Sequence, residues 1–256
     1  MIEFLYSLPS RSFFITLGMI VSLTVMMALL LWEYKFSLRF IVTSAISAAV
    51  TATSGIGGQL ARKLTYGGWL EPIKFINGLF EYEGTHYIGA ALYIMLIAPL
   101  LWLLVMRKEE GTFSRSGAGR YMSILSVYSI LQAFIGRIGC LRSGCCYGRA
   151  YYGFLRVPCI GLDYPTYPAV YTELLITFLT IAVIVPLHLK KKNTAHIFCI
   201  GYGLSVFISE FMYDRAGTVT LFGLTAIQIC ALALMILGLV FLRYGRKSAG
   251  CGKSRK

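Results

Sequence analysis

The residues most capable of chemistry gather in one stretch, Gly136 to Gly153, which reads GRIGCLRSGCCYGRAYYG. It begins inside an apolar run, and Arg137 is the first of its three arginines. An arginine at the centre of a bilayer costs about 3 kcal/mol unless it is paired, so it usually faces a bundle interior or a polar cavity. A guanidinium there can bind a phosphate through two parallel hydrogen bonds, and Gly136 and Gly139 would let another backbone or a ligand come close. We therefore interpret Arg137 as an anion-binding residue; the alternative is a side chain that anchors its helix by reaching the lipid headgroups.

Three further polar side chains occupy apolar segments or their ends: His86, Glu173 and Glu210. A neutral imidazole at His86 could take up a proton near pH 7, or the residue could simply cap the start of its helix. An acid inside a membrane is a functional candidate by default, yet a buried carboxylate must be protonated or paired. For Glu210 the alternative is therefore a structural ion pair with Arg215 or Arg137.

The seven cysteines do not have the spacing of a metal site. Cys140, Cys145 and Cys146 form the pattern C-x4-C-C, which differs from the paired C-x2-C units typical of zinc sites. We therefore expect no metal. Disulfides could form on an oxidising face, and a thiolate nucleophile beside Arg142 or Arg149 is conceivable. We favour a structural role over the nucleophile.

The elements that must position these residues are membrane-spanning helices. Hydrophobic residues make up 57% of the 256-residue chain, above the share of about half in soluble domains. A span needs about 20 mostly apolar residues, and such windows predict about seven helices: Phe13–Trp32, Phe40–Gly58, His86–Met106, Tyr121–Ile138, Pro168–Leu189, Ala195–Tyr213 and Leu221–Leu242. We expect an all-α polytopic membrane protein, with one domain over residues 1–242 and a basic cytoplasmic tail at 243–256.

Basic residues predict how the helices cross the membrane. With the N-terminus outside and the C-terminus in the cytoplasm, most of the 24 basic residues fall on the inner side, as the positive-inside rule requires. The net charge of +13 then suits anionic lipid headgroups, and we favour these over nucleic acid, which clustered Lys and Arg can also bind. The loops Gln59–Thr85 and Gly139–Tyr167 face outward together, and long loops are often functional.

The stretch GRIGCLRSGCCYGRA resembles the signature of bacterial prolipoprotein diacylglyceryl transferases, which reads approximately GRIGNFINGELYGR. Other segments follow in the family's order: INGLFEYEGTHYIGA in the place of GGMSFHGGLIG, YPAVYTELL in that of HPSQLYEAL, and YGLSVFISEFMYDR in that of YGxxRFxxEFxRE. The resemblance implies a seven-helix enzyme of the bacterial plasma (inner) membrane. It would move the diacylglyceryl group of phosphatidylglycerol onto the lipobox cysteine of a preprolipoprotein, and glycerol phosphate would leave. We expect no cofactor.

Several positions within the resemblance carry different residues. Arg137, Gly148 and Glu210 match the family pattern, whereas Cys140 replaces an asparagine and Val206 an arginine. The further exchanges are Ser143 for Asn, Cys145 for Glu, Tyr167 for His and Tyr213 for Arg. The polar site of this chain is therefore rebuilt relative to the family pattern.

On this basis we predict Arg137, His86 and Glu210 as catalytic residues. A second set is predicted to bind substrate: Arg142, Cys140, Ser143, Gly148, Arg149, Glu173 and Arg215. Arg137 and Arg142 would hold the phosphate, Arg215 would compensate for the missing arginine at Val206, and His86 or Glu210 would handle the thiol proton. Two alternatives remain open: an enzyme of the same fold with another donor or acceptor, and a non-catalytic lipid-binding membrane protein.

Overall fold

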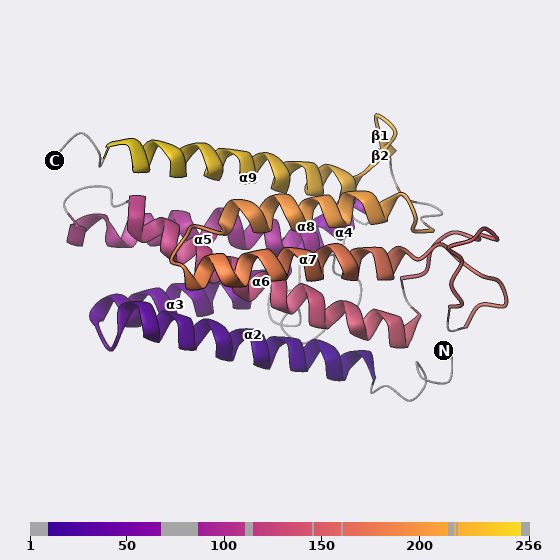
Figure 1. Cartoon of the computed structure of the whole chain (residues 1–256), viewed down its shortest axis with the longest axis horizontal. Helices are drawn as coiled ribbons and strands as arrows, with labels where there is room; N and C mark the ends of the chain where they lie inside the picture. The colour runs from indigo at the N-terminus through magenta and orange to yellow at the C-terminus, as the bar shows by residue number, and fades with distance from the viewer. Residues whose placement is uncertain are drawn as a thin grey trace.

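The computed structural model describes residues 10–67, 87–110, 115–144, 146–159, 161–214, 218 and 220–251. Helices make up most of this part of the chain and lie side by side along one direction (Figure 1). In chain order they are α2 (Arg11–Tyr34), α3 (Leu38–Thr53), α4 (Gly55–Tyr66), α5 (Tyr87–Glu110), α6 (Arg115–Ser143), α7 (Ala169–Leu189), α8 (Ala195–Glu210) and α9 (Ala226–Cys251). A short hairpin of β1 (Thr220–Leu221) and β2 (Leu224–Thr225) precedes α9.

The predicted all-α class and the seven apolar segments are confirmed within the described residues. Six spans are long and apolar enough to cross a membrane: α2, α3 together with α4, α5, α6, α7 and α9. The remaining predicted segment, Ala195–Tyr213, corresponds to α8, which ends earlier than predicted, at Glu210. Its 16 residues fall short of the roughly 20 that a full span needs. The direction in which the chain crosses the membrane stays a prediction, as does the division into a domain and a tail.

Helix α6 lies at the centre of the bundle. Within its apolar window 61% of the residues are buried, compared with 28% for α2, α7 and α9, and it contacts α2, α5, α7 and α8. Two of its buried polar groups are satisfied by neighbouring helices, which matters because a bilayer offers no water: Gln132 Oε1 accepts from Ser22 Oγ at 3.0 Å, and the Tyr121 hydroxyl accepts from Ser47 Oγ at 3.1 Å. A side chain on α6 is thus held from several sides.

Both predicted outward loops begin later than expected. Residues 59–66 continue the second span as α4, which follows α3 after Ser54. This helix packs so closely on α5 that a Cβ added at Gly57 would overlap the carbonyl oxygen of Gly89. Helix α6 likewise continues to Ser143, so the first part of the signature stretch is helical.

The hairpin before α9 occupies the first residues of the predicted last span. Thr220 pairs with Thr225 and Leu221 with Leu224, and both turn residues have positive φ, 54° at Phe222 and 77° at Gly223. Such a turn matches the twist of two antiparallel strands. Helix α9 therefore begins at Ala226, five residues later than predicted.

Candidate functional site

The candidate site lies at the end of the bundle where α6 ends, α7 begins and α8 ends (Figure 1). Arg137 belongs to the last turns of α6, Glu173 to the first turns of α7, and Tyr213 is the third residue after the end of α8. The packing of α6 against α7, and of α7 against α8, brings these three residues of distant sequence positions together. We call this end of the molecule the site end.

Arg137 and Glu173 form a buried ion pair. The Nε of Arg137 donates to Oε1 of Glu173 at 2.6 Å, with side-chain exposures of 20% for the arginine and 0% for the glutamate. A carboxylate can stay charged in such a place only when it is paired and hydrogen-bonded. The pair therefore fixes the guanidinium inside the bundle, beside its neighbours on α7 and α8.

The second oxygen of Glu173 is held by Ser209 of α8 and by Tyr213, which lies shortly after that helix. Oε2 accepts from the Tyr213 hydroxyl at 2.9 Å and from Ser209 Oγ at 3.4 Å. The backbone carbonyl of Glu173 also accepts from Ser205 Oγ at 3.1 Å. Every oxygen of Glu173 thus has a donor, and the carboxylate has little freedom to move.

Two thiols face the outer edge of the Arg137 guanidinium. Its Nη1 lies 3.5 Å from Cys146 Sγ and 3.9 Å from Cys140 Sγ. Sulfur is a weak hydrogen-bond acceptor, whereas a phosphate oxygen forms a short, charge-assisted hydrogen bond to arginine. An incoming phosphate would therefore displace these contacts readily.

The loop after α6 is fastened to the end of α8 by backbone hydrogen bonds. The N–H of Arg149 donates to the Met212 carbonyl at 2.8 Å, and the N–H of Asp214 donates to the Tyr147 carbonyl at 3.2 Å. The Arg149 side chain adds a third link, because its Nε donates to the Tyr213 carbonyl at 3.2 Å. The predicted binding residue Arg149 thus lies next to the residue that contacts Glu173.

Gly148 is required because the loop segment that contains it passes very close to the segment that ends at Tyr167. A Cβ at Gly148 would lie 2.4 Å from the Tyr167 carbonyl oxygen, and the N–H of Tyr167 donates to the Arg149 carbonyl at 3.0 Å. Any side chain at Gly148 would push the segment ending in Tyr167 away. Because α7 begins just after Tyr167, such a shift would also displace Glu173.

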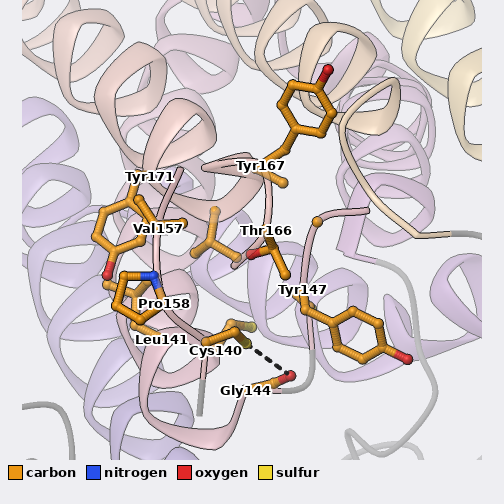
Figure 2. Close-up of a pocket in the computed structure, with 14 residues that line it drawn as sticks. Cys140, Leu141, Gly144, Tyr147, Val157, Pro158, Thr166, Tyr167 and Tyr171 are labelled. Carbon is orange, nitrogen blue, oxygen red and sulfur yellow. Dashed lines mark hydrogen bonds between the residues drawn. The ribbon is translucent and has the colours of Figure 1, made fainter. Parts of the chain in front are cut away.

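A small pocket opens beside these residues. Cys140 and Leu141 of α6, Gly144 and Tyr147 of the loop, and Val157, Thr166 and Tyr171 line it (Figure 2). Cys146 and Cys159 also line it, and Cys159 Sγ lies 3.9 Å from the Gly144 carbonyl oxygen. Its volume of about 30 Å³ accommodates roughly one water molecule. The pocket in this form is smaller than a lipid headgroup.

Sequence reasoning missed Tyr202 of α8. Its side chain is fully buried, and its hydroxyl faces Arg137 and Glu173 without a hydrogen bond of normal geometry to the described residues. A buried hydroxyl in that state costs about 1–3 kcal/mol unless water or a ligand satisfies it. The one signal in the sequence is that Tyr202 opens the segment YGLSVFISEFMYDR, which matches the family pattern; its residue type alone does not separate such a role from core packing.

The other predicted residues are placed as follows. Glu173, and not Glu210, is the acid paired with Arg137; Glu210 Oε1 instead accepts from Thr225 Oγ1 at 3.1 Å. Ser143 Oγ donates to the Cys140 carbonyl at 3.4 Å, and Arg142 lies in the same last turn of α6. His86, Cys145 and Arg215 lie outside the described residues. Within the described residues no group of three or more His, Cys, Asp or Glu side chains could hold a metal ion.

A comparison with protein families matches residues 6–244, nearly the whole chain, to prolipoprotein diacylglyceryl transferase. The chain belongs to the prolipoprotein diacylglyceryl transferase family. Comparisons with curated proteins and with solved structures gave no match. The family is one of transferases in lipoprotein biosynthesis, and the six apolar spans make this member a multi-pass membrane protein. Its reaction class is diacylglyceryl transfer, from a lipid donor to a prolipoprotein.

Several positions at which this chain differs from the family pattern lie at or near the Arg137–Glu173 pair. Cys140, where the resemblance expects asparagine, contacts Arg137, and Tyr213, where it expects arginine, contacts Glu173. Val206, at the position of the other expected arginine, is 2% exposed and belongs to the apolar core. The site end thus retains a fixed arginine and surrounds it with a set of neighbours of its own.

Proposed function

We propose that this chain transfers the diacylglyceryl group of phosphatidylglycerol to the thiol of a lipobox cysteine in a preprolipoprotein, at the outer face of the bacterial plasma membrane. The observation that carries the proposal is the Arg137–Glu173 pair, which fixes a guanidinium at one end of a membrane-spanning bundle beside a pocket. The family match supports the reaction class. The donor, the acceptor and the roles of individual residues belong to the proposal.

In this mechanism Arg137 binds the phosphate of the donor. Glu173 uses the Nε of the guanidinium, which leaves the Nη groups for phosphate oxygens, with Nη1 beside the weak acceptors Cys140 and Cys146. Arg142, Arg149, Gly148 and Ser143 lie on or near the same loop and would complete the headgroup site, with Arg215 adding a further charge. Guanidinium groups in a low-dielectric site stabilise the charge that develops on a departing phosphate.

The transfer itself exchanges one bond for another. The acceptor sulfur forms a thioether bond to the terminal glyceryl carbon, the bond between that carbon and the phosphate oxygen breaks, and glycerol phosphate leaves with the bonding electrons. The thiol proton passes to a general base, for which we propose His86 or Glu210. Both products then leave by different routes, the lipidated peptide into the bilayer and glycerol phosphate into water.

The test is transfer by purified protein from phosphatidylglycerol to a lipobox peptide, followed by mass spectrometry of the peptide. Replacing Arg137 by Gln should lower the rate by about 10²–10³-fold, the usual consequence of removing a donor that stabilises developing negative charge. The matched control is Arg120→Gln. Arg120 also pairs with an acid, Glu33, but it is largely exposed and lies near the other end of α6.

The outcomes separate the alternatives. Wild-type transfer with loss in Arg137→Gln and retention in Arg120→Gln supports the proposal, and an unchanged rate in Arg137→Gln contradicts it. The apolar Val206 favours testing another donor as the second candidate, because one expected headgroup contact is missing. Transfer from phosphatidylethanolamine or cardiolipin, but not from phosphatidylglycerol, would establish that candidate. Lipid binding without any transfer, together with failure to complement a strain depleted of its own transferase, would establish a non-catalytic role.

A further inference from the structure

Tyr213 contacts both Glu173 and the loop that follows α6. It is the third residue after the end of α8, is 2% exposed, and its hydroxyl donates to Glu173 Oε2 at 2.9 Å. Its backbone carbonyl accepts from Arg149 Nε at 3.2 Å, and its backbone is bridged to Gly148. One residue therefore connects the ion pair to the loop that carries Gly148 and Arg149.

The geometry of Glu173 shows what the Tyr213 hydroxyl does. A carboxylate beside an arginine ordinarily forms two parallel hydrogen bonds and covers one whole edge of the guanidinium. Here Arg137 receives only Oε1, through Nε, while Oε2 turns to Tyr213 and, at a longer 3.4 Å, to Ser209. The hydroxyl thus keeps the second oxygen from pairing with an Nη group.

We propose that Tyr213 is a positioning residue for Arg137: it holds Glu173 in single-oxygen contact, so that the carboxylate occupies neither Nη group and an anionic phosphate competes there only with weak acceptors such as the two thiols. This inference rests on the proposed function, because it assigns to Arg137 the phosphate of the lipid donor. The Tyr213 hydroxyl donates a hydrogen bond to Glu173 and carries no charge of its own. An arginine at this position would compete with Arg137 for Glu173, whereas the phenol fixes the carboxylate and leaves its charge for Arg137.

The decisive variant is Tyr213→Phe, which removes one oxygen and keeps the ring that packs with Cys140 and Val170. Oε2 is then released to pair with Arg137, and the phosphate must displace a carboxylate oxygen. We expect the dissociation constant for an anionic, short-chain phosphatidylglycerol, and the KM for this donor, to rise about tenfold, because a hydrogen bond to a charged group is worth at least this factor. The kcat at saturating donor should change less than about threefold.

The matched control is Tyr121→Phe, which removes an equally buried hydroxyl that bonds Ser47 of α3 and touches no site residue. It should leave donor binding unchanged. The second control is the double variant Tyr213→Phe/Glu173→Gln, compared with Glu173→Gln alone. Since Tyr213 acts through the carboxylate, its removal should have no further effect once the carboxylate is an amide.

The results discriminate clearly. A tenfold loss of binding that disappears in the Glu173→Gln background supports the proposal. Unchanged donor binding in Tyr213→Phe, the same loss in the Glu173→Gln background, or an equal loss in Tyr121→Phe overturns it. Binding is measured without transfer, so weaker binding by Tyr213→Phe in a protein that never lipidates the peptide supports the positioning role and overturns the proposed function. Normal transfer with unchanged binding does the reverse.

Discussion

Removal of the buried carboxylate should reveal how much the Arg137–Glu173 pair matters to the fold. Glu173→Ala leaves a guanidinium that is 20% exposed without its charged partner, inside a bundle whose neighbouring groups are arranged around the pair. Breaking a buried ion pair from one side destabilises a protein by about 3–5 kcal/mol. For a chain of this size each kcal/mol lowers the melting temperature by about 2–4 °C, so a decrease of roughly 10 °C is expected.

The assay is heating in detergent followed by size-exclusion chromatography, which reports the fraction that remains monodisperse at each temperature. Glu33→Ala is the control, because it removes an acid whose partner, Arg120, is 56% exposed, and such pairs contribute only about 0–1 kcal/mol. The double variant Arg137→Met/Glu173→Leu tests the reasoning further. Replacing both charges by apolar groups should restore stability to within about 2 kcal/mol of wild type while transfer stays lost. A Glu173→Ala variant that melts with wild type, or a double variant as unstable as the single one, would refute this account.

Two further predictions concern the loop beside the pair. Alkylation with N-ethylmaleimide should block donor binding, because an adduct on Cys146 would fill a pocket of about 30 Å³ next to Arg137. Donor binding by the Cys146→Ser variant should be markedly less sensitive to the reagent. Full binding by protein shown to be alkylated at Cys146 would exclude this pocket as the donor site. Gly148→Ala should lower both the melting temperature and the transfer rate, the latter by at least about tenfold, since a Cβ there would overlap the Tyr167 carbonyl and misplacement of site groups by an ångström can cost two orders of magnitude. Equal rates for Gly148→Ala and wild type would show that the loop tolerates the overlap.

The fold could be predicted largely because a bilayer imposes a simple rule on the sequence. Runs of about 20 apolar residues marked seven segments, and each corresponds to a helix in the described structure. Ends were harder to predict. Hydropathy falls before the helix stops in α6, where Arg137 and Arg142 are still helical. The reverse holds before α9, where apolar Leu221 and Leu224 form strands around the Phe222–Gly223 turn.

The candidate site could be predicted only in part, because sequence spacing shows what lies on one helix and not which helix lies opposite. Arg137 was identified as a cation of interest, but a pair with Glu210 was considered only as an alternative and a pair with Glu173 was not considered, whereas the structure pairs Arg137 with Glu173. Glu173 near the start of α7 and Glu210 at the end of α8 both lie at the site end, and the packing of α6 on α7 decides between them. Tyr202 was missed because an aromatic ring in an apolar run is typical of any core, and only its place at the start of the segment YGLSVFISEFMYDR pointed to it.

The shortness of α8 has a consequence for how a lipid reaches this site. At 1.5 Å per residue, its 16 residues rise about 24 Å, which is about 6 Å less than a typical hydrocarbon core of about 30 Å. If one end of α8 is level with the edge of the core, its other end, where Ser209 and Tyr213 hold Glu173, remains below the opposite edge. Bilayers respond to such a mismatch by thinning locally. The bilayer around the site end is therefore expected to be locally thinner. This thinning would bring lipid phosphates to the level of Arg137 while their acyl chains stay in the hydrocarbon core.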